Sequence, residues 1–206
     1  YSFTWYNDYS KMEGVMDNMF ILLTVAIAPG LALFSYFYLR NEMKTEPRKT
    51  LLQSFVYGAA ITFPILFIQY VLTEEGVFLN PFVQHVLFTS VLEEFFKWFL
   101  LYLAIYHHVE FDDPYDGILY GASISLGFAT VENVLYLLSY GVDTAFMRAL
   151  LPVSSHALFG VVMGYYLGKS KFTKRTKKYL WLAFLAPVLL HIVYNGILML
   201  EDAWLY

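Results

Sequence analysis

Six long apolar stretches, separated by short polar ones, dominate the pattern of this chain. A helix needs about 20 predominantly apolar residues to cross a bilayer, with about 17 to 25 usual, and the six stretches match this length within a residue or so. The pattern predicts an all-α, polytopic membrane protein, a bundle of six transmembrane helices with room for a few extra interfacial helices. The predicted spans are residues 19–39, 51–72, 82–106, 115–140, 145–168 and 179–200.

Composition supports this class of protein. Hydrophobic residues make up 59% of the 206 positions and charged residues 15%, whereas soluble domains typically carry about 45 to 50% apolar and about 25% charged residues. The chain has no cysteine, which excludes disulfides, thiolate nucleophiles and thiolate metal ligands. No linker interrupts the apolar stretches, so we expect one transmembrane domain over residues 19–206, embedded in the lipid bilayer and without a nucleic-acid partner.

The basic residues indicate the orientation of the chain in the membrane. Four lie at the connection after the first span and six at the connection after the fifth, so ten of the 13 are on one face. Lysine and arginine mark the cytoplasmic side, and both termini are therefore expected outside the cytoplasm. The ten residues are Arg40, Lys44, Arg48, Lys49, Lys169, Lys171, Lys174, Arg175, Lys177 and Lys178.

Small residues are concentrated in the fourth span. Gly117, Gly121 and Gly127 occur there together with two alanines and two serines. Small side chains let helix backbones approach closely in a membrane. We therefore expect the fourth span near the centre of the bundle.

Glu93, Glu94 and Lys97 lie inside the third span. A single charge at the centre of a spanning helix costs about 2.5 to 3.5 kcal/mol, so three charges together require an explanation. A structural ion pair between Glu93 and Lys97, four residues apart, is one interpretation. Lys97 cannot fully neutralise both carboxylates, and the remaining one indicates a functional site.

Three further spans carry an acid or an imidazole at a similar depth. At about 1.5 Å of rise per residue, Glu93 and Glu94 lie roughly 16 to 18 Å from the outer end of their span. On the same basis Glu132, His156 and His191 lie roughly 12 to 17 Å from the outer ends of theirs. Taken singly, each could be a helix–helix hydrogen-bonding residue. Their joint depth predicts one shared site in the outer half of the membrane.

Two amides lie next to these residues. Asn195 shares a face with His191 one helical turn away, and Asn133 directly follows Glu132. Each could instead be an interhelical hydrogen-bonding residue. Two or more carboxylates, two imidazoles and an amide suit activation of water by a carboxylate and support of a developing oxyanion. This chemistry hydrolyses an acyl bond and requires no cofactor.

Other functions fit parts of the same set. Two histidines and one glutamate are a common zinc set with an open fourth position, although the chain contains no His-Glu-x-x-His motif. A proton-coupled transporter could use the three glutamates as relay sites, but it would spread polar residues on both sides of the membrane midplane. A scaffold that binds a partner helix would tolerate loss of Glu93 or Glu94.

Four motifs resemble those of a known family: Glu93-Glu94-Phe-Phe-Lys97, Phe128-Ala-Thr-Val-Glu132-Asn133, Ser155-His156 and His191-Ile-Val-Tyr-Asn195. They are similar to motifs of the PrsW-type intramembrane glutamic proteases, within the wider superfamily of CAAX prenyl proteases and bacteriocin-processing proteins. The likeness extends from residue 19 to about residue 200.

The resemblance implies a protease of the bacterial cytoplasmic membrane. Such proteases make the first, site-1 cut in the extracytoplasmic part of a membrane-anchored anti-sigma factor, which starts an envelope-stress response. By resemblance, Glu93 and Glu94 would be the essential acidic pair that activates water, His191 and Asn195 would support the oxyanion, and His156 would orient water or polarise the scissile carbonyl. Lys97 and Asn133 would support them.

The chain departs from the wider superfamily at two positions. The superfamily has Glu-Glu-x-x-x-Arg, whereas Lys97 comes one residue earlier than that arginine. It also has Phe-x-x-x-His, whereas Phe128 is followed by Glu132. The acid in place of the superfamily's histidine leaves three roles open for Glu132: a base, a ligand or a structural partner. It also makes a prenylated substrate less expected than the tail of a membrane protein.

Residues 1–18 form a separate extension ahead of the first span. Trp5, Tyr9, Met12 and Met16 recur at helical spacing and give this polar segment an apolar stripe. One interpretation is an amphipathic helix at the outer surface of the membrane, or a cloning remnant. The other is a fused segment that resembles the aromatic tail of an anti-sigma factor substrate.

Overall fold

The computed structural model describes residues 2–40, 48–140 and 145–204, and the side chains of residues 19–39, 48–140 and 151–200. All elements in these ranges are helices, as the apolar pattern predicts. They are α1 (Ser2–Arg40), α2 (Arg48–Glu74), the π-helical η2 (Phe82–Phe88), α3 (Thr89–Leu100), the π-helical η3 (Leu101–Ile105), α4 (Pro114–Tyr140), α5 (Ala145–Phe172) and α6 (Thr176–Trp204). The side chains of the predicted stripe on residues 1–18 lie outside the described set.

Four described helical segments are long and apolar enough to cross a membrane. They are Met19–Leu39, Arg48–Glu74, Pro114–Tyr140 and Thr176–Leu200. The predicted third span is helical but carries three charges, and π-helical turns flank its 12-residue α-helical part. The predicted fifth span lies within α5, where His156 and two serines lower the hydropathy. The chain is thus a multi-pass membrane protein, with four clearly apolar spans within the part of the chain that the structure describes.

Helix α4 lies at the centre of the bundle, as its small residues predict. Its residues 119–130 are all buried, and it contacts α1, α2 and α5 extensively. A Cβ atom added at Gly121 would lie too close to the carbonyl oxygen of Gly160 on α5, and one added at Gly164 would overlap the carbonyl oxygen of Gly117. The α4 and α5 backbones are therefore in direct contact, which larger residues at these positions would prevent.

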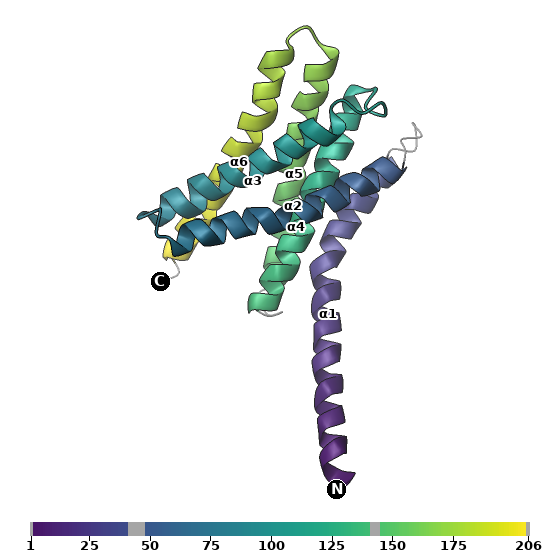
Figure 1. Cartoon of the computed structure of the whole chain (residues 1–206), viewed down its shortest axis with the longest axis vertical. Coiled ribbons are helices and arrows are strands. Elements are labelled where there is room, and N and C mark those ends of the chain that lie inside the picture. The colour runs from purple at the N-terminus through teal and green to yellow at the C-terminus, as the bar shows by residue number, and fades with distance from the viewer. Residues whose placement is uncertain (1, 41–47, 141–144, 205–206) are drawn as a thin grey trace.

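The helices do not run parallel to one another. In Figure 1, α4, α5 and α6 run roughly along the long axis of the view, whereas α2 and α3 cross them at a steep inclination. Helix α1 lies beside α4, and its N-terminal part extends beyond the ends of the other helices. The inclination brings the middle of α3 against α6 and close to α4, where its charged residues meet the polar residues of the other helices.

Candidate functional site

Helix α3 places Glu93, Glu94 and Lys97 in the interior of the bundle. Their residues are 3%, 0% and 0% exposed. The Lys97 ammonium lies 2.8 Å from Glu94 Oε1 and 3.9 Å from Glu93 Oε2, because positions three and four residues apart share one face of a helix. Lys97 therefore pairs closely with Glu94 rather than with Glu93. Its ammonium also lies 4.1 Å from the centre of the Phe128 ring, a cation–π contact with α4.

Lys97 connects α3 to α5 and α4 through His156. Its Nζ lies 2.9 Å from His156 Nδ1, and His156 Nε2 lies 3.0 Å from Glu132 Oε2. An ammonium only donates hydrogen bonds, so Nδ1 accepts and Nε2 carries the proton that is donated to Glu132. Both nitrogens of His156 are therefore engaged in a chain that joins three helices.

His191 of α6 makes a second connection to α3. Its Nδ1 lies 3.0 Å from Glu94 Oε1. A carboxylate only accepts, so Nδ1 carries the proton and the lone pair of Nε2 remains available. The His191 ring is nearly perpendicular to that of His156, with centroids 5.1 Å apart. Glu94 thus receives hydrogen bonds from Lys97 and His191 and acts as the anchor of the cluster.

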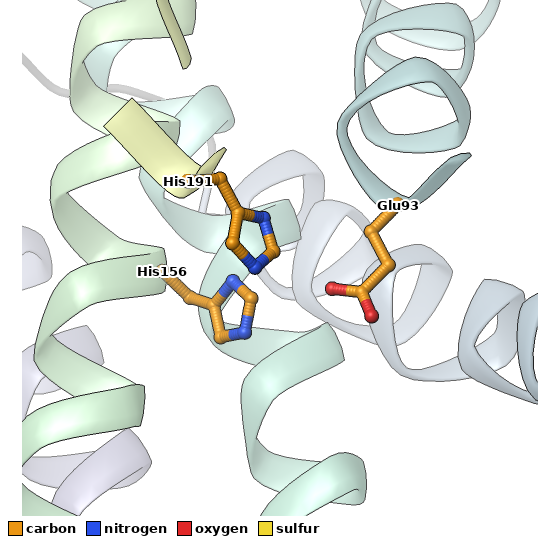
Figure 2. Close-up of side chains that lie close together, drawn as sticks. All are labelled: Glu93, His156 and His191. Carbon is orange, nitrogen blue, oxygen red and sulfur yellow. The ribbon is translucent and has the colours of Figure 1, made fainter. Parts of the chain in front are cut away.

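Glu93 has a different environment from Glu94. Its Oε1 accepts a hydrogen bond of 3.1 Å from Gln69 Nε2 on α2, while Oε2 is buried and accepts none from the described part of the chain, with the Lys97 ammonium 3.9 Å away. Figure 2 shows Glu93, His156 and His191 facing one another from three separate helices. Glu94 Oε2 also accepts no hydrogen bond from the described residues, so the two glutamates differ in that Glu93 alone lines the cavity beside them.

A cavity of about 420 Å³, here called the polar cavity, lies at this meeting point. It contains Glu93, Glu132 and both histidines in its wall, but not Glu94 or Lys97. Its volume accommodates several residues of an extended peptide as well as water. The lining residues are His85, Val86, Thr89, Glu93, Glu132, Pro152, His156, His191, Tyr194, Asn195, Leu198 and Met199.

The two predicted asparagines lie in different places. Asn195 lines the polar cavity, and its Nδ2 donates to Ser90 Oγ at 3.1 Å and to the His85 carbonyl at 3.4 Å. Asn133 lies away from the cavity and donates to the carbonyl of Ala26 on α1 at 2.8 Å. Asn133 is therefore an interhelical hydrogen-bonding residue, whereas Asn195 is positioned at the site.

Several residues of the site carry no clear signal in the sequence. Gln69 bonds directly to Glu93, His85 and Thr89 line the polar cavity, and the buried Ser90 accepts a hydrogen bond from Asn195. Gln69 is a polar residue within a predicted span, as Glu93 is, and this is the one signal in the sequence that could have drawn attention to it. The spacing of α2 alone does not indicate which neighbour it contacts, so only the fold assigns it to Glu93.

The donor set is compatible with a metal ion. One ligand atom from each of Glu93, His156 and His191 lies within 4.8 Å of the others, and all three residues are buried. Two imidazoles and a carboxylate are a usual zinc set with an open fourth position. Lys97 is a competing cation at the same place, because its ammonium lies 2.9 Å from His156 Nδ1 and 3.9 Å from Glu93 Oε2.

Comparison with known proteins identifies related sequences over most of the chain. Residues 46–206 match the profile described as PrsW family intramembrane metalloprotease. The chain is 54% identical over 189 residues to Protease PrsW of Geobacillus kaustophilus, covering 91% of this chain and 84% of the relative. It is 52% identical to Protease PrsW of Bacillus subtilis, covering 91% and 87%, and 32% identical to that of Clostridioides difficile, covering 91% and 82%. No solved structure matches the chain.

Proposed function

The chain belongs to the PrsW family of intramembrane proteases, and we propose that it is a glutamate-type endopeptidase that makes the first cut in the extracytoplasmic part of a membrane-anchored anti-sigma factor. The observation that carries the catalytic assignment is the position of Glu93, and not Glu94, in the wall of the polar cavity, with an Oε2 that accepts no hydrogen bond from the described residues. Anti-sigma factor cleavage follows from the resemblance of the motifs. Membership of a protease family favours hydrolysis over the transporter and scaffold alternatives.

Glu93 is the proposed general base. Its Oε2 takes a proton from water, the water oxygen bonds to the scissile carbonyl carbon, and the carbonyl becomes an oxyanion. The protonated Glu93 then gives its proton to the peptide nitrogen as the carbon–nitrogen bond breaks, which restores the carboxylate. Gln69 holds Oε1 and so leaves Oε2 directed toward the reacting water.

The hydrogen bonds divide the two histidines into different roles. His191 uses its N–H on Glu94, so its Nε2 lone pair can accept from the water and orient it. The N–H groups at the cavity wall belong to His156 Nε2, which donates to Glu132, and to Asn195, whose longer hydrogen bond is to the His85 carbonyl at 3.4 Å. We assign support of the oxyanion to these two groups, which would exchange those acceptors for the oxyanion as it forms. This differs from the sequence-based assignment, in which His191 supports the oxyanion. Glu132 holds His156 in the donating tautomer.

Glu94 and Lys97 are positioning residues. Lys97 is fully buried and does not line the polar cavity, and its ammonium contacts Glu94 at 2.8 Å and His156 at 2.9 Å, so it acts on these two residues rather than on substrate. A buried ion pair of this kind fixes the rotamers of the groups that it touches. The pair holds His156 and His191 at the cavity wall, and Lys97 lies nearer to Glu94, at 2.8 Å, than to the water-binding Oε2 of Glu93, at 3.9 Å.

A metal-dependent version is a second candidate, favoured by the Glu93–His156–His191 cluster and the family description. Those three residues would hold the ion, and a bound zinc ion would polarise the scissile carbonyl and activate water. In that version Glu132 is the remaining carboxylate at the cavity wall and would serve as the base. The position of Lys97 among the donors favours the metal-free version.

The proposed orientation in the membrane places the site on the side where the substrate would be cut. All six helices cross the bilayer, residues 19–206 form the protease domain, and both termini lie on the extracytoplasmic side. The bias of the basic residues toward the connections after α1 and α5 supports this orientation. Substrate then reaches the polar cavity from the outer side, where residues 1–18 also lie.

A cleavage assay with purified protein and a membrane-anchored anti-sigma factor tests the proposal. Glu93→Gln is expected to lower the cleavage rate by about 100- to 10,000-fold, the usual contribution of a general base. Glu75→Gln, at an exposed position outside the cavity, is the matched control and should cleave normally. Retained elution volume and melting temperature show that Glu93→Gln is folded; cleavage at the wild-type rate by this variant overturns the assignment.

Treatment with excess chelator distinguishes the metal-free mechanism from the metal-dependent one. The metal-free proposal predicts unchanged cleavage after chelation and dialysis. Loss of cleavage that zinc restores would replace it by the metal-dependent version, in which Glu132→Gln removes the base. If the protein leaves the anti-sigma factor intact but cleaves another membrane protein, the proposed peptidase activity stands and the proposed substrate is wrong.

A further inference from the structure

A second cavity lies next to the polar cavity, between the last turns of α2 and the π-helical η2. Its volume is about 300 Å³, and we call it the side cavity. His85 and Thr89 line both cavities, so their side chains form the boundary between the two. Small-molecule pockets usually measure about 300 to 1,000 Å³. The side cavity is at the lower end of this range, with room for one or two side chains but not for a folded segment.

Gln69 connects the side cavity to the proposed base. It lines the side cavity, and its Nε2 donates at 3.1 Å to Oε1 of Glu93, which lines the polar cavity. An occupant of the side cavity therefore lies beside the residue that holds the base. An extended peptide advances about 3.3 Å per residue, and its successive side chains point to opposite sides. A peptide bond that lies at Glu93 thus brings the side chain of a nearby residue, one or two positions away, to the side cavity.

The chemistry of the wall indicates which side chains fit. None of the ten lining residues is Asp, Glu, Lys or Arg. Phe78 and Phe88 pack against each other with ring centroids 4.7 Å apart and give the wall an apolar part. A charged side chain that entered would leave water without gaining a counter-ion, which is unfavourable. The side cavity therefore favours a large uncharged side chain.

Hydrogen bonds between η2 and α2 give the side cavity a defined shape. Gln84 Nε2 lies 2.6 Å from Thr73 Oγ1, and that hydroxyl lies 2.8 Å from the Gln69 carbonyl. A hydroxyl has one proton to donate, so Thr73 donates to the carbonyl and accepts from Gln84. Two lining residues from different helices are thereby held together before a substrate arrives. Such preorganisation lowers the entropic cost of binding.

We propose that the side cavity is a specificity subsite of the peptidase, which accepts a large uncharged side chain one or two residues from the scissile bond. This rests on the proposed function, in which Glu93 acts on a peptide bond in the polar cavity. Gln84 and Thr73 contact the accepted side chain, and His85 and Thr89 lie along the substrate backbone between the cavities. Gln69 keeps its role as the positioning residue of Glu93.

Identification of cleavage sites tests the subsite without a known substrate. Purified protein is incubated with a detergent-solubilised fraction of bacterial membrane proteins, and new N-termini are identified by mass spectrometry. Termini that are absent with Glu93→Gln mark the cuts that depend on the base. At one position within two residues of the cut bond, wild type is expected to enrich leucine, methionine and phenylalanine and to deplete all four charged residues.

Two variants of the wall should change this preference in opposite directions. Gln84→Glu adds a carboxylate and should raise cleavage of sites with lysine or arginine at that position about fivefold, as expected for a partly exposed ion pair. Thr73→Lys adds an ammonium and should raise cleavage of sites with aspartate or glutamate there by a similar factor.

Gln53→Glu is the matched control for the added charge. Gln53 lies 20 residues, or about 30 Å, from Thr73 along α2 and lines neither cavity. Charges separated by more than the Debye length of about 8 Å are largely screened, so this variant should keep the wild-type preference.

The outcomes separate the subsite from the proposed function. Wild-type elution volume and melting temperature identify the variants that fold, and Gln84→Glu and Thr73→Lys each test the site alone because they lie on different helices. Cleavage with an unchanged preference in a folded wall variant, or the same change in Gln53→Glu, overturns the subsite and leaves the proposed function standing. Absence of any cleavage that depends on Glu93 contradicts the proposed function and the subsite with it.

Discussion

The contact between α4 and α5 and the environment of α3 show two opposite ways of packing helices in the same bundle. Glycines let the α4 and α5 backbones touch, so that no side chain separates Gly121 from Gly160 or Gly117 from Gly164. Helix α3 instead presents glutamates, a lysine and large aromatic residues to its neighbours, and cavities of about 420 and 330 Å³ lie beside it.

The difference shows where this bundle is built for rigidity and where it is built for chemistry. In a membrane, apolar burial gives little driving force between helices, so close packing of small residues has to hold them together. The α4–α5 contact supplies this, and it holds His156 and Glu132 on a fixed frame. The charged α3 can then leave space for water and substrate, while its own Lys97 pairs with Glu94 and donates a hydrogen bond to His156 of that frame.

The largest expected effect comes from removing the cation that neutralises α3. Lys97→Met leaves Glu94 buried without its ammonium partner, and breaking a buried pair in this way costs about 3 to 5 kcal/mol. Unfolding of the purified protein in detergent, followed by circular dichroism, measures the loss. Lys174→Met, at an exposed position, is the control and should change stability by less than about 0.5 kcal/mol.

A second variant sharpens this prediction. Lys97→Met combined with Glu94→Gln removes both charges and should recover most of the lost stability, because neither partner is then an isolated ion. Equal destabilisation by the single and double variants would show that the packing of Lys97, including its contact with Phe128, matters more than its charge.

An intermediate effect is expected at the α4–α5 contact. Gly164→Ala places a Cβ atom against the Gly117 carbonyl, and the backbones must separate at a cost of about 1 to 3 kcal/mol. Gly196→Ala is the matched change on α6, where the nearest atom would be Val86 Cγ1 at 3.9 Å. It should be neutral or stabilising by up to about 1 kcal/mol, since alanine favours helix. The same unfolding measurement separates the two, and equal effects would contradict direct backbone contact.

The smallest expected effect concerns the hydrogen bond that orients Glu93. Gln69→Met keeps the side-chain size and removes the Nε2 donor, so kcat should fall about tenfold while KM stays nearly constant. Gln53→Met, on the same helix but away from the polar cavity, is the control. A rise in KM with unchanged kcat would indicate that Gln69 contacts substrate rather than positioning Glu93.

Much of the fold follows from the hydrophobic pattern. The first predicted span coincides with the apolar segment Met19–Leu39, and the small residues of the fourth span predict its central position. The inclination of α2 and α3 does not follow, because span length fixes how far a helix can reach but not its angle to its neighbours. Depth along the chain therefore grouped the acids and imidazoles but could not define their contacts. Of the two roles open to Asn133, beside the site or between helices, its bond to Ala26 of α1 favours the second.

The sequence by itself determined that charged residues lie inside apolar helices and that four helices supply them at a similar depth. Only the tertiary structure decided that Glu93 faces the polar cavity while Glu94 is bonded to Lys97 and His191. Neighbouring residues on a helix point about 100° apart, so the rotation of α3 assigns one glutamate to chemistry and the other to support. That rotation is set by contacts with α2, α4 and α6, which are distant in sequence and leave no periodic signal in α3 itself.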